Sequence, residues 1–427
     1  MIDEVQAAPG LSAVECRRAI EALRSGVPNR DAVKALGSSQ QHIEEKFRQQ
    51  LQATMVDVTR DAQAAGLLVA GDFGSGKSHL LEYLRHVALD EHFVCSKVVL
   101  SKETPLFDPV KLYRAASETA AVPGKRGAAL MEIAAGLDFA GDEYREFYRW
   151  VNAPETGLHS FFQATLFLYE QVKDQEIRDQ IVWFWSGEPL KVSDLRNWLN
   201  AQGEPGKYQR ERISPTDLAL QRFRFVARLI VAAGYTGWVL LVDEAELVAR
   251  YSFRQRARSY AELARWLGKR RGETYAGLLS VVAITTDFAE AVLEQRKDAT
   301  VIPERLRANE APVDQILASH AERGMRLISR EATRLSLPSR GMVDQTHERV
   351  RSIHARAYDW QPPPAAAFER LATTSMRQYV RRWINEWDLQ RLYPGYQVDT
   401  IVGELKLDYS EEAALETPPD GEAEPAQ

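Results

Sequence analysis

The sequence predicts an α/β fold in which a parallel sheet carries a large helical insertion and is followed by a C-terminal helical lid. Three observations lead to this class. A glycine-rich loop at 71–78 joins an apolar run at 66–70 to an amphipathic helix. A second apolar run, 237–242, ends in Asp243-Glu244. Helical patterns fill the long segment between the two motifs, as crossovers between parallel strands require.

The glycine-rich loop fits the pattern G-x-x-x-x-G-K-[ST], which binds phosphate when it lies between a strand and a helix. We call residues 71–78 the phosphate loop. Its glycines let backbone N–H groups approach an anion, and the following helix N-terminus adds partial positive charge. Lys77 would contact the β- and γ-phosphates of ATP, and the Ser78 hydroxyl would bind Mg²⁺. The alternative is a glycine-rich turn without a ligand. The residues predicted to contact ATP are Gly71, Asp72, Phe73, Gly74, Ser75, Gly76, Lys77, Ser78 and His79.

The composition is that of a globular protein, with 427 residues of which 45% are hydrophobic and 27% charged. This length predicts two or three domains. No run approaches the ~18 apolar residues of a membrane span, so no membrane partner is expected. The N-terminus lacks the pattern of a secretory signal. Cys16 and Cys95 fit no metal spacing, which favours a reducing compartment, and we predict a cytoplasmic protein.

The N-terminal residues, 1–55, predict a helical segment that packs on the core. Two short helices are expected on either side of a break at 25–29, followed by a third at 43–51. The β-rich run 92–101 predicts a second core strand after the phosphate loop. The core is expected over 56–310. Its helical insertion, at about 109–233, has predicted helices at 109–121, 126–137, 142–152, 158–184, 193–201 and 215–233.

Two carboxylates follow the apolar run at 237–242. Asp243 would hold Mg²⁺, mainly through water. Glu244 would polarise the attacking water as a general base. Many strands end in acids without any function, but downstream of an intact phosphate loop the Asp-Glu pair predicts ATP hydrolysis.

Two hydroxyls, Thr285 and Thr286, end the next predicted strand at 276–286. Either would cap a helix at 288–295, or would match the polar residue that orients the water and the γ-phosphate in additional-strand ATPases, which this region resembles. Farther on, Arg305 suits an arginine finger that completes a neighbour's site in a homo-oligomer, although a plain surface arginine is the alternative.

A basic helix is predicted over 254–271, with seven basic residues against one acid. Such a helix would contact nucleic-acid phosphates or a neighbouring subunit's nucleotide, or would present a solvated face. The sequence leaves these alternatives open.

The C-terminal lid is predicted over 311–409. Arg377 begins its last helix, from where it would reach the phosphates when the lid closes. Residues 410–427 predict an acidic, disordered tail. The expected elements of the lid are helices at 312–334, 341–357, 364–372 and 375–391, and a closing hairpin at 396–407.

These motifs, taken in order, resemble those of AAA+ ATPases in the branch of origin-recognition and STAND proteins. The resemblance implies a P-loop NTPase core, in which the threonines and Arg377 sense the γ-phosphate. It also implies that the Val27-Pro28 turn packs on the adenine, unless this is only a proline turn between helices. The chain departs from ordinary modules because Lys77 and Asp243 are 166 residues apart, which the helical insertion explains.

Four stretches resemble a narrower family, the BrxD-like ATP-binding proteins of BREX phage-defence systems, over residues 13–409. The resemblance implies an ATP-hydrolysing switch or motor that works with other BREX proteins, including a helicase and a methyltransferase module. The alternative is a non-catalytic module that binds DNA or serves as a scaffold in response to nucleotide. The stretches are RAIEALRSGVPNR (18–30), GDFGSGKSHLLE (71–82), VVLSKETPL (98–106) and SMRQYVRRW (375–383).

Overall fold

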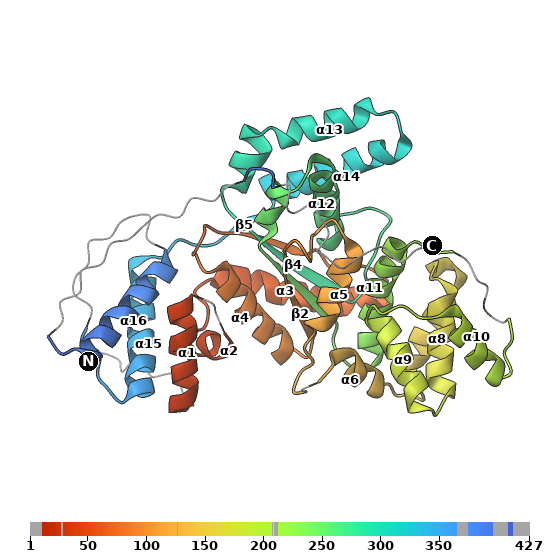
Figure 1. The fold of residues 1–427 in the computed structure, drawn as a ribbon, viewed down its shortest axis with the longest axis horizontal. Coiled ribbons are helices and arrows are strands. Elements are labelled where there is room, and N and C mark those ends of the chain that lie inside the picture. Colours follow the sequence, from red (N-terminus) through yellow and green to blue (C-terminus); the bar gives the residue numbers. More distant parts are fainter. Residues whose placement is uncertain are drawn as a thin grey trace.

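The computed structural model describes residues 11–26, 29–125, 127–206, 208, 212–364, 375–395 and 409–412. A five-stranded parallel sheet lies at its centre, in the order β2-β3-β4-β1-β5 (Figure 1). This confirms the predicted α/β class, and four strands overlap the predicted runs. The strands are β1 (Leu67–Ala70), β2 (Val94–Val99), β3 (Trp238–Asp243), β4 (Leu278–Ile284) and β5 (Thr333–Arg334).

Strand β5 was not expected, because the sequence predicts a helix through residue 334. That helix, α14 (Pro312–Arg330), ends earlier, and Thr333 and Arg334 pair with Val69 and Ala70 at the edge of the sheet. A strand of two residues is too short to produce an alternating pattern in the sequence.

Helices cover both faces of the sheet, which explains why β3 and β4 are buried along their whole length. Alternate side chains, including Val239 and Leu241, share a hydrophobic core with α3 (Gln41–Thr59) and α4 (Lys77–Asp90). Their neighbours Leu240 and Val242 point the other way, into the largest core of the molecule.

The helical insertion lies between β2 and β3, on the right of Figure 1. The expected single helix at 158–184 is wrong: Val172 leaves helical geometry, and the Asp174 carboxylate accepts hydrogen bonds from the Glu176 and Ile177 N–H groups to start a new helix. The described α-helices of the insertion are α5 (Pro109–Glu118), α6 (Ala129–Ala135), α7 (Asp142–Asn152), α8 (Ser160–Gln171), α9 (Gln175–Ser186), α10 (Val192–Ala201) and α11 (Pro215–Ala232).

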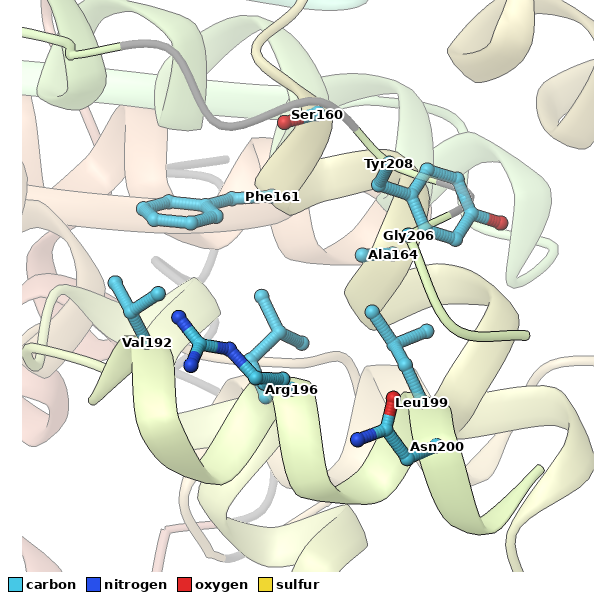
Figure 2. A pocket seen from close by; sticks show the side chains of 10 residues that line it. Ser160, Phe161, Ala164, Val192, Arg196, Leu199, Asn200, Gly206 and Tyr208 are labelled. Carbon is cyan, nitrogen blue, oxygen red and sulfur yellow. The ribbon is translucent and has the colours of Figure 1, made fainter. Parts of the chain in front are cut away.

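A small pocket lies between α8 and α10 of the insertion. Figure 2 shows Phe161 and Ala164 of α8 facing Val192 and Leu199 of α10, with Tyr208 beside them. Its free space is about 20 Å³, which is room for about one water molecule. The pocket is therefore too small for a nucleotide.

Helices from both ends of the chain form a separate unit, on the left of Figure 1. The helices α1 (Ala13–Ser25) and α2 (Arg30–Leu36) pack with α15 (Arg340–Tyr358) and α16 (Met376–Leu392) around their own hydrophobic cluster. Tryptophans of α16 fill the centre of this cluster. We call these four helices the terminal helix unit.

A third group of helices lies above the sheet in Figure 1. It contains α12 (Phe253–Trp266), α13 (Asp298–Ala308) and α14, which pack closely on one another. Although α14 falls within the predicted lid at 311–409, its buried residues belong to the largest core, together with those of the sheet and insertion. Two shorter elements precede α13: the 3-10 helix η2 (Ala245–Arg250) and the π-helix η3 (Ala289–Gln295).

The close contact between α12 and α14 depends on Gly324. A Cβ atom at this position would lie 1.9 Å from the backbone oxygen of Tyr260, which cannot move without shifting α12. We expect Gly324→Ala to lower the free energy of unfolding by about 3 kcal/mol, measured by chemical denaturation. Gly341→Ala is the matched control, because a Cβ there meets nothing within 4 Å. Equal stability of both variants would contradict this packing.

Several expected features lie wholly or largely outside the described residues. These are the Val27-Pro28 turn, the helix at 364–372, the hairpin at 396–407 and most of the acidic tail. Both cysteines are buried as free thiols. Among the described helices, none combines the length and apolar character that a membrane crossing needs.

Candidate functional site

The candidate site lies at the carboxyl edge of the sheet, where the ligands of open α/β sheets collect. Because β4 lies between β1 and β3, the phosphate loop after β1, Thr285 after β4 and Asp243 at the end of β3 lie on neighbouring strands. The loop is attached to β4 by a 3.1 Å hydrogen bond from the Gly71 N–H to the Ile284 carbonyl. Motifs that are distant in the sequence therefore meet at one edge.

The backbone of the phosphate loop needs glycine at two positions. Gly74 has φ +76° and Gly76 has φ +103°, in the left-handed region that residues with a Cβ rarely adopt. This path ends at Lys77, the first residue of α4, so the loop leads directly into the helix N-terminus. The arrangement has the strand, loop and helix that anion binding requires.

Lys77 is buried in a polar cage. Its Nζ donates a 2.8 Å hydrogen bond to the Gly71 carbonyl and lies 3.5 Å from Glu246 Oε1. Burial raises the pKa of Glu246, and the charge of Lys77 opposes that rise. Glu246 Oε2 is buried and has no hydrogen-bond partner among the described residues.

The sequence analysis did not single out Glu246. A signal was present, because Glu246 is the next acid after Asp243-Glu244, but its role depends on the short helix η2. That helix turns the side chain back towards Lys77.

Asp243 and Glu244 have different environments although they are neighbours. Asp243 is 3% exposed, and its Oδ1 accepts a 3.0 Å hydrogen bond from the Glu244 N–H. Glu244 adopts φ +60°, which turns it out of the strand. Partial burial and the charge of Asp243 raise the pKa of Glu244, while Lys77 and Arg377 oppose the shift. A higher pKa makes the Glu244 carboxylate a better proton acceptor.

The oxygen ligands that Mg²⁺ prefers are present in the two predicted metal-binding residues. Ser78 lies in the first turn of α4, and Asp243 ends β3. The described residues contain no cluster of three or more His, Cys, Asp and Glu side chains suited to a metal. This donor set fits Mg²⁺, which commonly takes one or two protein oxygens and completes its shell with phosphate and water.

Thr285 is 2% exposed at the end of β4. Its hydroxyl contacts the Tyr409 hydroxyl at 2.8 Å, a residue 124 positions away that sequence patterns did not indicate. Thr286 is the more exposed of the two threonines. No side chain caps the following helix η3, so the capping alternative for these threonines has no support.

The terminal helix unit contacts the phosphate loop through the start of α16. The Arg377 N–H donates to the Gly74 carbonyl at 3.4 Å, and the Arg377 guanidinium lies 5.4 Å from the centre of the Phe73 ring. From α4, the His79 Nε2 lies 2.8 Å from the Gly37 carbonyl, and burial lowers the pKa of this histidine. The imidazole of His79 thus joins α4 to the terminal helix unit.

The helices above the sheet carry Arg305 and most of the basic segment 254–271. Arg305 is exposed on α13, where its guanidinium lies over the Phe253 ring at 4.8 Å. In the basic segment 254–271, five of the seven bases form ion pairs with acids, and Arg256 and Arg265 are buried. Most of this charge is therefore neutralised within the fold.

Comparison with known proteins supplies the family. The model of the family described as BREX system ATP-binding protein BrxC/D matches residues 11–137 and 168–403, which is well over half of the chain. Neither a search of curated proteins nor a search of solved structures found a match. The match includes the phosphate loop, Asp243-Glu244, Thr285 and Arg377. The chain belongs to the BrxC/D family of BREX system ATP-binding proteins.

Proposed function

We propose that this protein is a Mg²⁺-dependent ATPase of the AAA+ type that acts as a switch or motor within the BREX defence system. The observation that carries the proposal is the meeting of three strand ends at one edge of the sheet. There the phosphate loop begins at Gly71, which is hydrogen-bonded to the end of β4. Lys77 is within ion-pair distance of Glu246 in η2, the short helix that directly follows Asp243-Glu244. Membership of an ATP-binding family supports ATP as the ligand.

Each of these residues has its own role in phosphoryl transfer. The N–H groups of residues 71–79 bind the phosphates, and Lys77 moves from Glu246 to the β- and γ-phosphates. Ser78 and Asp243 would hold Mg²⁺, which would supply positive charge to the phosphate oxygens. Glu244 accepts a proton from the attacking water, and Thr285 or Thr286 orients that water. Rate enhancement then comes from positioning and charge stabilisation.

The terminal helix unit would transmit the state of the nucleotide. Arg377 already contacts the loop backbone and has its guanidinium over Phe73. A short movement of this side chain towards the γ-phosphate would link hydrolysis to the position of α16. Arg305, exposed on α13, would serve a neighbouring copy in a homo-oligomer. Other BREX components, such as a helicase or a methyltransferase module, are the proposed readers of these movements.

The rival function is a module that binds nucleotide without turnover and contacts DNA. The ion pairs of the basic segment 254–271 count against DNA binding through α12, because paired and buried arginines are not available to phosphates.

Metal removal tests the proposed function. Purified protein should release phosphate from ATP in excess Mg²⁺. Chelation with EDTA should reduce the rate by about a hundredfold or more, because the metal would stabilise the charge that develops in the transition state by several kcal/mol. Restored Mg²⁺ should recover the activity. Phosphate release that stays at the buffer background in Mg²⁺ would contradict hydrolysis and favour the non-catalytic module.

A further inference from the structure

A short C-terminal segment, residues 409–412, is attached beside the candidate site. We call it the C-terminal strap. Three arginines hold it: Arg296 Nη1 donates to the Tyr409 carbonyl at 2.9 Å, Arg256 pairs with Glu411, and Arg250 pairs with Glu412. The Glu412 N–H also donates to the Arg250 carbonyl at 2.9 Å. These contacts fix the backbone of the strap against η2 and η3.

Two of the arginines that hold the strap, Arg256 and Arg296, are themselves anchored to a buried carboxylate. Arg256 is 5% exposed, and its Nε donates to the buried carboxylate of Asp298 at 3.0 Å. Arg296 bonds to the same carboxylate and to the Ala249 carbonyl in η2. The strap therefore rests on a rigid network that continues into the helix following Asp243-Glu244.

The Tyr409 hydroxyl lies between the side chains of Asp287 and Thr285, which follow the end of β4. It donates a 2.8 Å hydrogen bond to Asp287 Oδ1 and lies 2.8 Å from Thr285 Oγ1. The Tyr409 ring packs edge-on against Phe288, at 6.2 Å between ring centres. The hydroxyl is thus held from both sides.

The direction of these two hydrogen bonds follows from their donors. An ionised carboxylate only accepts, so the single proton of Tyr409 goes to Asp287. The hydrogen bond between the two hydroxyls must then be donated by Thr285 to the Tyr409 oxygen. The Thr285 proton is engaged there, and only lone pairs of Thr285 Oγ1 remain for other partners.

We propose that Tyr409 is a positioning residue that makes Thr285 a hydrogen-bond acceptor towards the attacking water. This inference rests on the proposed ATPase function. A free threonine hydroxyl can donate its one hydrogen to a phosphate oxygen, and it can also accept hydrogen bonds from water. The relay from Thr285 through Tyr409 to Asp287 selects the second role. A water that donated one hydrogen to Thr285 and the other to Glu244 would keep a lone pair free to attack the γ-phosphorus.

Tyr409→Phe tests the relay because it removes one oxygen and keeps the ring on Phe288. At saturating ATP and Mg²⁺ we expect kcat to fall about tenfold, the effect of one oriented hydrogen bond. The affinity for ADP, measured by calorimetry, should stay unchanged because the phosphate loop is intact. Asp287→Asn keeps an acceptor oxygen and should retain most of the activity, whereas Asp287→Ala should behave like Tyr409→Phe. Tyr393→Phe is the matched control, since Tyr393 is 63% exposed after α16.

A double-mutant cycle separates positioning from general damage. In a Thr285→Ala background, Tyr409→Phe should produce no further loss of kcat, because the group that it positions is absent. A wild-type kcat in Tyr409→Phe, or an equal further loss in the Thr285→Ala background, would overturn the inference while leaving the ATPase intact. Wild-type protein that releases no phosphate would overturn the proposed function and this inference together.

Discussion

Lys77→Ala should abolish ATP hydrolysis and weaken ATP binding by about a hundredfold or more. The ammonium group would make charge-assisted hydrogen bonds to the phosphates, each contributing roughly 1.5–3 kcal/mol. The substitution also removes the counter-charge of Glu246, so the pKa of this largely buried carboxyl would rise further. Phosphate release and calorimetric titration with ATP measure both effects.

The control for this variant is a lysine at the same sheet edge that does not belong to the loop. Lys102 follows β2 and is partly exposed, so Lys102→Ala should bind ATP as the wild type does. Circular dichroism during heating checks that both variants are folded. If Lys77→Ala binds ATP with wild-type affinity, the nucleotide site is elsewhere.

Glu244→Gln should separate binding from turnover. The amide keeps the size of the side chain but cannot accept the proton of the attacking water, so kcat should fall about 10²- to 10⁴-fold. ATP affinity should be retained, since Lys77, Ser78 and Asp243 are unchanged. Glu304→Gln, at an exposed position on α13, is the control and should match the wild type.

The pH profile gives Glu244 a second test. Burial and Asp243 raise the pKa of the carboxyl in the folded protein. The base works only when ionised, so kcat should fall as the pH is lowered through this raised pKa. The variant Glu244→Gln should lack this limb of the profile. A full wild-type rate in Glu244→Gln would mean that another group is the base, and the buried Glu246 would be the first to examine.

The features that could be predicted from the sequence are local ones. The phosphate loop and its flanking strand and helix occupy one continuous stretch, and β3 and β4 are apolar runs with sharp polar ends. The predicted helix starts at 215 and 375 lie within one residue of the observed ones, where Ser214 caps α11 and Ser375 caps α16 with a reciprocal bond to Gln378. Each of these signals lies within one short stretch of the sequence.

The features that were missed depend on long-range contacts. Tyr409 touches Thr285 only because Arg296, Arg256 and Arg250 attach the strap beside η2 and η3. The terminal helix unit combines helices from both chain ends, and no period in the sequence marks that pairing. Glu246 faces Lys77 because the chain turns in η2 directly after Glu244. Such contacts become visible only when the strands are placed in order.

A structure of Glu244→Gln determined with ATP and Mg²⁺ is the most direct measurement of the central claim, that the three strand ends form one ATP hydrolysis site. We expect the phosphates on the N–H groups of residues 71–79, the metal between Ser78 and Asp243, and Lys77 moved from Glu246 to the phosphates. A nucleotide bound elsewhere on the chain, or a metal without Ser78 and Asp243 in its environment, would contradict the claim.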